Sequence, residues 1–175
     1  MPHRACIGSI LCSLGLSIML VMALVGCGGS AMGGTGTGTD GSQTGCVAGT
    51  QEINGVNTRQ FCGPAKAQAT TNGQTMNWSN GECSTTGGAF SVNIGRIILG
   101  TSDAAKELKK QYDYFGITLQ ATNDGTYDKA VISMDYQGQS YALISSSLTL
   151  SDGMKLGTFT GNDLKGVSVN GSFSC

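Results

Sequence analysis

The sequence predicts a mainly β fold: an antiparallel β-sandwich or curled sheet, with one short α-helix packed on it and disulfide cross-links. The chain has 28 glycines and only 2 prolines, and many of the glycines follow Asn or Asp, which are pairs that favour tight hairpin turns. In residues 46–175, apolar and polar residues alternate in short runs, as they do in strands with one buried face. The same segment holds an even number of cysteines, which is typical of small exported domains with disulfide bonds.

Residues 1–26 have the layout of a secretory signal peptide, with an early positive charge at Arg4, a long apolar run and small residues at the end. A membrane-spanning helix is the alternative, because about 20 apolar residues are enough to cross a bilayer. The run ends in Leu24-Val25-Gly26-Cys27, which resembles the lipobox of bacterial lipoproteins. That resemblance implies that the Cys27 thiol carries a diacylglycerol, that acyl chains such as palmitate anchor the protein, and that the chain is cleaved just before Cys27.

Residues 27–45 are predicted to be a flexible linker that begins at the lipidated cysteine. The segment is rich in Gly, Ser and Thr and nearly uncharged, so it has too little apolar surface to offset the entropy of ordering. The expected organisation is therefore a signal peptide at 1–26, this linker, and a β-rich globular domain at 46–175. Cleavage would remove Cys6 and Cys12 with the signal peptide.

Several segments of the globular domain alternate with the period of a strand. The turn pairs Asp124-Gly125, Gln137-Gly138 and Asp152-Gly153 lie between such runs, so we expect a meander of hairpins across the second half. Met76 and Trp78 are two residues apart and would fall on the same face of a strand, so they are also expected in the core. The other residues predicted to face the core are Phe90, Val92, Ile94, Ile117, Leu119, Ala121, Ala130, Ile132, Met134, Tyr136, Val167, Val169, Phe173 and Cys175.

The segment at 101–116 breaks the alternation and predicts a helix. Ser102 or Asp103 can cap its start, and Gly116 suits its end. Its lysines raise the alternative of a helix lying on a membrane, but acidic residues dilute their charge, and packing of the apolar stripe against the sheet is favoured. That stripe consists of Ala104, Leu108, Tyr112 and Phe115.

The cysteines of the globular domain are expected to form two disulfide bonds, and four cysteines permit three pairings. A hairpin turning at Asn72-Gly73 would place Cys62 opposite Cys83, but a second turn pair at Asn80-Gly81 would interrupt that register. The residues alone therefore leave the pairing open. Metal binding is the alternative, yet there is no CxxC pair and the mature chain has no histidine, so no metal site is expected. The four cysteines are Cys46, Cys62, Cys83 and Cys175.

Three stretches of this domain are AKAQATTNGQTMNWSNGECSTTGGAFSVNIG, NDGTYDKAVISMDYQG and the closing VNGSFSC. They resemble the mature domain of the mycobacterial nineteen-kilodalton lipoprotein antigen family, over roughly Ala65 to Cys175. The resemblance implies a bridge between Cys83 and Cys175, which leaves Cys46 and Cys62 to pair with each other. It also implies surface exposure and recognition of the acylated N-terminus by a host receptor.

The composition bears on function mainly by exclusion. Charged residues make up 12% of the chain and the formal net charge is −1, whereas a nucleic-acid surface needs clustered Lys and Arg. The mature chain lacks a histidine to serve a Ser-His-Asp triad, and no SxxK motif occurs. A hydrolase that pairs carboxylates among Asp124, Asp128 and Asp135 is the least favoured hypothesis, because turns and strand surfaces account for these acids.

The sequence thus predicts a non-enzymatic lipoprotein, lipid-anchored on the exported side of a bacterial cell envelope. We expect a monomer without a cofactor, attached to the membrane through Cys27. An envelope protein or a host receptor is the candidate partner, and nucleic acid is not. The alternative is a carrier of a small apolar ligand, which needs a cavity of roughly 300–1,000 Å³ inside the sandwich or beneath the helix.

Overall fold

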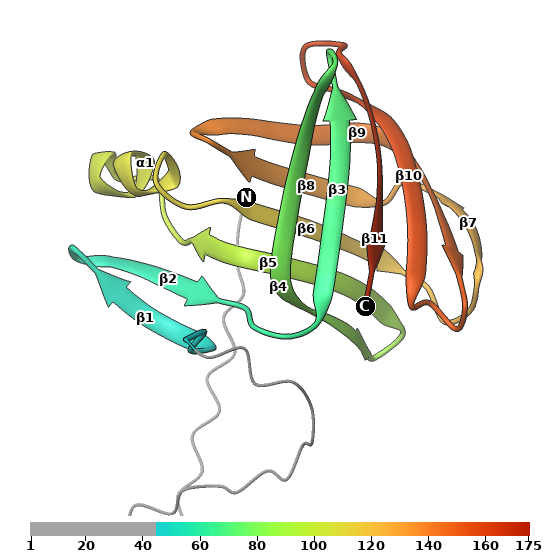
Figure 1. Ribbon diagram of the computed structural model, residues 1–175, viewed down its shortest axis with the longest axis horizontal. Coiled ribbons are helices and arrows are strands. Elements are labelled where there is room, and N and C mark those ends of the chain that lie inside the picture. Colours follow the sequence, from blue (N-terminus) through green and yellow to red (C-terminus); the bar gives the residue numbers. More distant parts are fainter. Residues whose placement is uncertain (1–44) are drawn as a thin grey trace, which may run out of the picture. The chain divides into compact units, whose positions relative to one another are not determined.

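The computed structural model describes residues 45–175, which form a mainly β structure with one short helix (Figure 1). Of the predicted segments, the signal peptide and all but the last residue of the linker lie outside the described residues. The elements are β1 (Gly49–Ile53), β2 (Val56–Gln60), β3 (Ala65–Thr71), β4 (Gln74–Thr86), β5 (Ala89–Ile98), α1 (Asp103–Lys109), β6 (Tyr114–Gln120), β7 (Gly125–Asp128), β8 (Val131–Tyr136), β9 (Gln139–Ser151), β10 (Leu156–Asp163) and β11 (Ser168–Ser174).

Eight of these strands close into an antiparallel barrel. They follow one another around the ring in chain order from β3 to β11, with β7 paired separately to β9. The ring is completed where the first barrel strand, β3, pairs with the last, β11. The predicted strands and short helix are confirmed, but the β-sandwich is wrong: the sheet curls so far that it closes on itself. Alternation within each strand cannot distinguish the two architectures, because strands bury one face in both.

The long strand β4 serves two parts of the barrel because it bends at Asn80 and Gly81. Its first part pairs with β3 and its second part with β5, and the register shifts beside Ala65. Asn80 has a φ of 67°, a backbone conformation that Asn adopts more readily than most residues. A Cβ placed on Gly81 would overlap Ile94. Asn80 and Gly81 therefore form a bend within one strand and not the predicted second turn. In the view of Figure 1, β3 and β4 cross steeply in front of β5 and β6.

The inward-facing side chains fill the barrel with one apolar core. The ring of Trp78 lies 5.3 Å from that of Phe115 and 5.4 Å from that of Tyr136, and Phe115 lies 5.7 Å from Phe159. Every residue predicted to face the core belongs to it or packs against it, except Val167, which is half-buried outside it. The buried members are Ala65, Ala67, Ala69, Met76, Trp78, Phe90, Val92, Ile94, Phe115, Ile117, Leu119, Ala121, Ala130, Ile132, Met134, Leu143, Leu148, Leu150, Phe159, Val169 and Phe173.

Two reciprocal glycine–phenylalanine pairs shape the barrel where β10 meets β11. Gly157 lies opposite Phe173, and Phe159 lies opposite Gly171. A Cβ added to either glycine would overlap the ring across from it. Glycine in a strand permits a sharp bend and a close approach, and each aromatic ring occupies the space that the glycine side chain leaves.

The helix is shorter than predicted and presents a different stripe. It starts after the N-cap Ser102, whose side-chain oxygen accepts a hydrogen bond from Ala105 N at 3.2 Å, and it ends at Lys109. Ala105 and Leu108 are its buried residues, so the stripe is shifted by one position from the predicted Ala104. The predicted end is wrong because the chain extends as β6 before Gly116 is reached.

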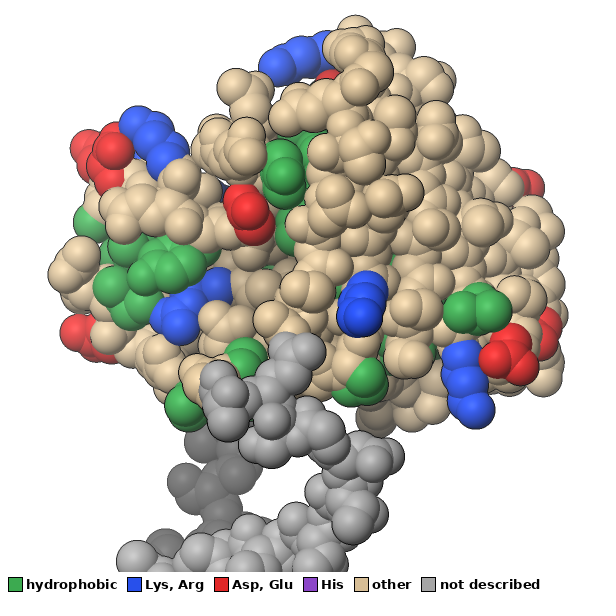
Figure 2. All heavy atoms as spheres, viewed as in Figure 1, with side chains coloured by type: hydrophobic (Ala, Val, Ile, Leu, Met, Phe, Trp, Pro, Cys, Tyr) green, Lys and Arg blue, Asp and Glu red, His purple; other side chains and the backbone are tan. Residues whose placement is uncertain are grey.

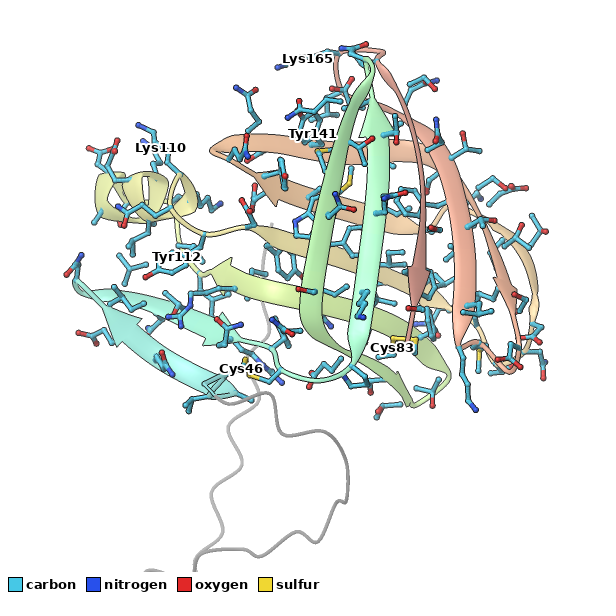
Figure 3. The ribbon with its side chains drawn as sticks, viewed as in Figure 1. Cys46, Cys83, Lys110, Tyr112, Tyr141 and Lys165 are labelled. Carbon is cyan, nitrogen blue, oxygen red and sulfur yellow. A yellow bond between two sulfur atoms is a disulfide. The ribbon has the colours of Figure 1, made fainter. Side chains whose placement is uncertain are left out.

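The helix belongs to a second, smaller core beside the barrel. Ala105 and Leu108 pack there against Val56 of β2 and Ile98 of β5. Tyr112 packs against the same cluster and lies between the helix and β2 (Figure 3). The helix is therefore packed on the sheet, as predicted, at the end of β5 where the β1–β2 hairpin is attached.

Two disulfide bonds join Cys46 to Cys62 and Cys83 to Cys175. This is the pairing that the family resemblance implies, not the hairpin pairing of Cys62 with Cys83. The first bridge encloses the β1–β2 hairpin and spans 16 residues, whereas the second links β4 to the residue after β11 and spans 92 residues. Cys46 and Cys83 lie well apart on the structure (Figure 3).

The Gly157→Ala substitution should lower the free energy of unfolding by roughly 1–3 kcal/mol, because the added methyl group must displace the ring of Phe173 in a filled core. Urea denaturation of the wild type and the variant measures this difference. Thr158→Ala, at the exposed neighbouring position, is the control and should cost less. An equal cost for both variants would contradict the packing argument.

Loss of the Cys83–Cys175 bridge should destabilise the fold more than loss of the Cys46–Cys62 bridge. On the chain-entropy model, bridges of 92 and 16 residues contribute about 4.6 and about 3 kcal/mol respectively. Denaturation of the paired Cys→Ala variants of each bridge tests the order. A larger loss from Cys46→Ala/Cys62→Ala would show that chain entropy does not govern this difference.

Candidate binding surface

Cys27, the predicted lipidation site, lies outside the described residues, so the structure bears only on the globular domain. Within residues 45–175, no helix is both long enough and apolar enough to cross a membrane. In that part of the chain, no three His, Cys, Asp or Glu side chains lie together as a metal site requires.

The three acids of the hydrolase hypothesis lie in different local settings, namely a turn and the strands β7 and β8. The carboxylate of Asp124 accepts hydrogen bonds from the backbone N–H groups of Gly153 and Met154, at 3.0 and 2.6 Å, and so holds the β9–β10 turn. Asp128 is on β7, is exposed and faces Ser147 of β9. These contacts place two of the acids on a turn and on a strand surface.

Asp135 is on β8, where its carboxylate accepts a hydrogen bond from Ser140 and its carbonyl accepts one from Trp78 Nε1 at 3.2 Å. Asp135 faces Ser140 on β9, and Asp128 faces Ser147. Seven residues of strand therefore separate the two acids, a span of roughly 23 Å. Carboxylate pairs in glycosidases are less than about 10 Å apart, so the structure does not bring these two acids together.

The carrier hypothesis requires a cavity inside the sheet or beneath the helix. The largest fully buried side chains include Phe90, Phe115, Met76 and Leu148, which lie in the barrel interior. A substantial depression lies on the outside of the sheet.

A groove of about 720 Å³ crosses the outer surface of the barrel, and we call it the outer groove. Its two walls are rows of outward-facing side chains, and each row runs across β4, β3, β11, β10 and β9 through residues that are partners in the strand pairing. The first row is Ser79, Lys66, Ser174, Leu156 and Ser151. The second row is Asn77, Gln68, Ser172, Thr158 and Thr149.

The floor of the outer groove is formed by the residues between the two rows. These are Trp78, Ala67, Phe173 and Gly157, and the first three have side chains buried in the barrel core. The groove floor is thus mainly backbone. Gly157 belongs to this floor without deepening it, because a side chain there would point into the core towards Phe173. Seen from outside, the face over β3, β4, β11 and β10 carries few charged or apolar side chains (Figure 2).

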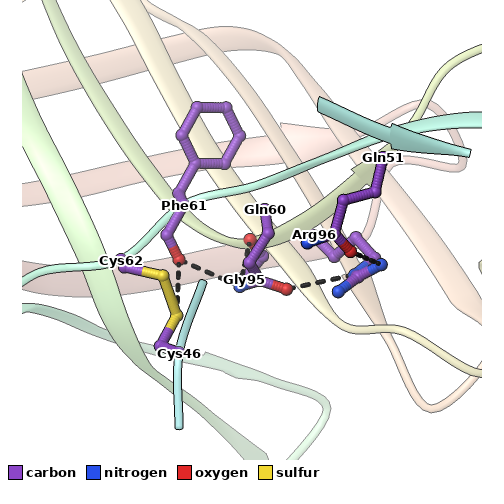
Figure 4. The surroundings of a disulfide bond; sticks show 7 residues. All are labelled: Cys46, Gln51, Gln60, Phe61, Cys62, Gly95 and Arg96. Carbon is purple, nitrogen blue, oxygen red and sulfur yellow. Dashed lines mark hydrogen bonds between the residues drawn. A yellow bond between two sulfur atoms is a disulfide. The ribbon is translucent and has the colours of Figure 1, made fainter. Parts of the chain in front are cut away.

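A second hollow, of about 580 Å³, lies beside the Cys46–Cys62 bridge and is lined mostly by polar residues that include Arg96. Arg96 Nε donates to Gln60 Oε1 at 3.0 Å, and Nη1 donates to Gln51 Oε1 at 3.2 Å (Figure 4). The guanidinium also lies 4.8 Å from the centroid of the Tyr112 ring. These contacts tie β1, β2 and β5 together and engage the cation with groups of the protein itself.

Tyr114 is the titratable side chain with the strongest perturbation among the described residues. It is 7% exposed, and its hydroxyl donates to Asn93 Oδ1 at 2.8 Å. Burial, and to a lesser degree the negative charge of Asp135, raise the pKa of Tyr114 to about 12. Both groups lie within paired strands, and neither lines the outer groove, so we interpret Tyr114 as a structural residue.

The raised pKa predicts a dependence of stability on alkaline pH. The unfolded chain loses the Tyr114 proton near its ordinary value of 10.0, and the folded chain only near 12. The stabilisation is therefore complete below the unfolded pKa and is lost as the pH rises towards the folded one. Unfolding free energies measured over this range should fall more steeply for the wild type than for Tyr114→Phe. Equal slopes would show that Tyr114 is not protected.

The outer groove and the Arg96 hollow differ in what they offer a ligand. In the hollow, the guanidinium of Arg96 already contacts two glutamine side chains and the ring of Tyr112. The groove instead offers exposed hydroxyl and amide groups. The two rows that form the groove walls could not be predicted from the sequence, because they depend on the pairing registers of five strands. Comparison with protein-family models, curated proteins and solved structures finds no match for this chain.

Proposed function

We propose that this protein is a non-enzymatic lipoprotein, exported and anchored through Cys27 to a membrane of a bacterial cell envelope. The observation that carries the proposal is Leu24-Val25-Gly26-Cys27 at the end of a signal-like apolar run. On this proposal the acylated cysteine holds the protein at the membrane, and the linker that follows lets the barrel stand away from it. The role of the barrel is then to present a binding surface on the exported side.

The two disulfide bonds support export, because such bonds form and persist in oxidising compartments and are rare in the cytosol. Anchoring follows from the chemistry of the lipid. Each buried CH₂ group contributes about 0.8 kcal/mol, so one acyl chain binds only marginally and two or more hold a protein stably. A diacylglycerol on Cys27 supplies two chains.

The alternative function, carriage of a small apolar ligand, is supported less well. Side chains of one apolar core occupy the barrel interior. The outer groove has more apolar than polar exposed lining surface, but it is open and has hydroxyl and amide side chains along both walls. A hydrolase built on Asp124, Asp128 or Asp135 is the least supported candidate, because the pairing with β9 separates Asp128 from Asp135 and the carboxylate of Asp124 binds the β9–β10 turn.

Lipidation is tested by growing bacteria that express the full chain with an alkyne fatty-acid probe and detecting the label on the purified protein. The wild type should be labelled and should partition into detergent, whereas Cys27→Ala should carry no label and should remain in the aqueous phase. Cys12→Ala is the matched control, since it also removes a cysteine of the predicted signal peptide, and it should be labelled like the wild type. Equal labelling of Cys27→Ala would refute the anchor.

A further inference from the structure

We propose that the outer groove binds an uncharged polysaccharide, laid across the strands of the barrel. This inference goes beyond membrane anchoring and does not depend on the acylation of Cys27. It rests on three features of the groove that the structure shows together: its nearly charge-free walls, its regular array of hydroxyl and amide groups, and its length across five paired strands.

The polar array extends beyond the walls of the groove. A third row continues the same face and contains only hydroxyl and amide side chains. Across all three rows, the exceptions to Ser, Thr, Asn and Gln are Lys66 and Leu156. The third row is Thr75, Thr70, Asn170, Thr160 and Ser147.

Hydroxyl and amide groups can both donate and accept hydrogen bonds, so such a face matches a partner whose own groups are hydroxyls. Gln68 Nε2 donates to Asn77 Oδ1 at 2.9 Å, and this contact aligns two exposed amides side by side on one wall. Thr149 and Thr126 exchange a hydrogen bond of 3.0 Å where the same row reaches β7. The methyl groups of the threonines, Leu156 and the Gly157 floor supply apolar contact for the C–H faces of sugar rings.

The dimensions favour an extended chain over a single small molecule. The two walls are two residues apart along each strand, or roughly 7 Å, and five strands span roughly 19 Å. Each hydrogen bond between neutral groups contributes only about 0.5–1.5 kcal/mol net. Useful affinity therefore requires many contacts, and a polymer lying along the groove provides them.

The same composition argues against other classes of partner. A polyanion such as a nucleic acid would find one cation, Lys66, in the groove, whereas such partners need several. Protein interfaces concentrate aromatic residues, Met and Arg at their centre, and Leu156, 45% exposed, is the one large apolar side chain exposed in the groove. The strands beneath the groove are paired with their neighbours, so no free edge offers itself to an added strand.

Affinity electrophoresis tests the proposal with the full chain purified in detergent. Native gels contain glycogen, laminarin or yeast mannan as neutral polymers, or alginate and heparin as polyanions. At least one neutral polymer should retard the wild type in a concentration-dependent manner, and the polyanions should not. Absence of retardation by every neutral polymer, or retardation by the polyanions alone, would overturn the proposal.

Two threonine variants assign the binding to the groove. Thr158 is in the wall, whereas Thr118 is an exposed residue of β6, a strand that contributes to neither the groove nor the three rows. Thr158→Arg should weaken binding of the neutral polymer at least about tenfold, because the long cationic side chain occupies the groove. Thr118→Arg adds the same charge away from the groove and should remain within about twofold of the wild type.

Equal binding by these two variants would overturn the assignment of the site. If Thr158→Arg fails to fold, as thermal unfolding would reveal, Gln68→Ala removes one wall amide and should weaken binding by about threefold to tenfold. Unchanged binding by Gln68→Ala would then overturn it. Because the polymers are offered to purified protein whether or not Cys27 is acylated, this result is separate from the outcome of the lipid-labelling experiment.

Discussion

The pairing of β3 with β11 is the constraint on which the rest of the structure depends. These strands begin and end the barrel, and the partners run from Val169 and Thr71 to Ser174 and Lys66. Without this pairing the sheet would have two free edges, and the apolar core would be open to water along one side. The hydroxyl of Thr71 donates to the carbonyl of Ser168 at 3.1 Å and reinforces one end of the junction. The Cys83–Cys175 bridge retains the other end.

The outer groove lies directly over this junction. Lys66 and Gln68 on β3 are the cross-strand partners of Ser174 and Ser172 on β11, and the rows extend to both sides from these central pairs. The groove is therefore a product of closure: its walls become continuous only when the last strand has docked on the first. The core and the groove also share residues. Those whose side chains lie in the core on one side of the sheet form the floor of the groove on the other side.

Local patterns predicted much of this fold. Residues such as Phe90, Val92 and Ile94 alternate strictly with polar neighbours, so their strand and its buried face could be recognised without a structure. Closure of the barrel could not be recognised in this way. It depends on pairing between strands about a hundred residues apart, and neither strand's own sequence identifies its partner. The β1–β2 hairpin was not predicted, although Asn54-Gly55 at its turn, both with positive φ, is a recognisable signal. The helix was predicted too long because Phe115 fits a helical stripe and an inward strand position equally well.

The Cys46–Cys62 bridge has a mechanical consequence. A pull on the chain at Gly45 would otherwise unzip the β1–β2 hairpin, one pair of hydrogen bonds at a time. Because the sulfur atoms of Cys46 and Cys62 are bonded, the disulfide transmits the force directly from Cys46 to Cys62, and the hairpin between them bears none of it. The force then acts on the chain just before Ala65, at the start of β3. This strand, β3, is hydrogen-bonded on both sides, to β4 and to β11. Detaching it requires many hydrogen bonds to break together, whereas the hairpin would open one pair at a time.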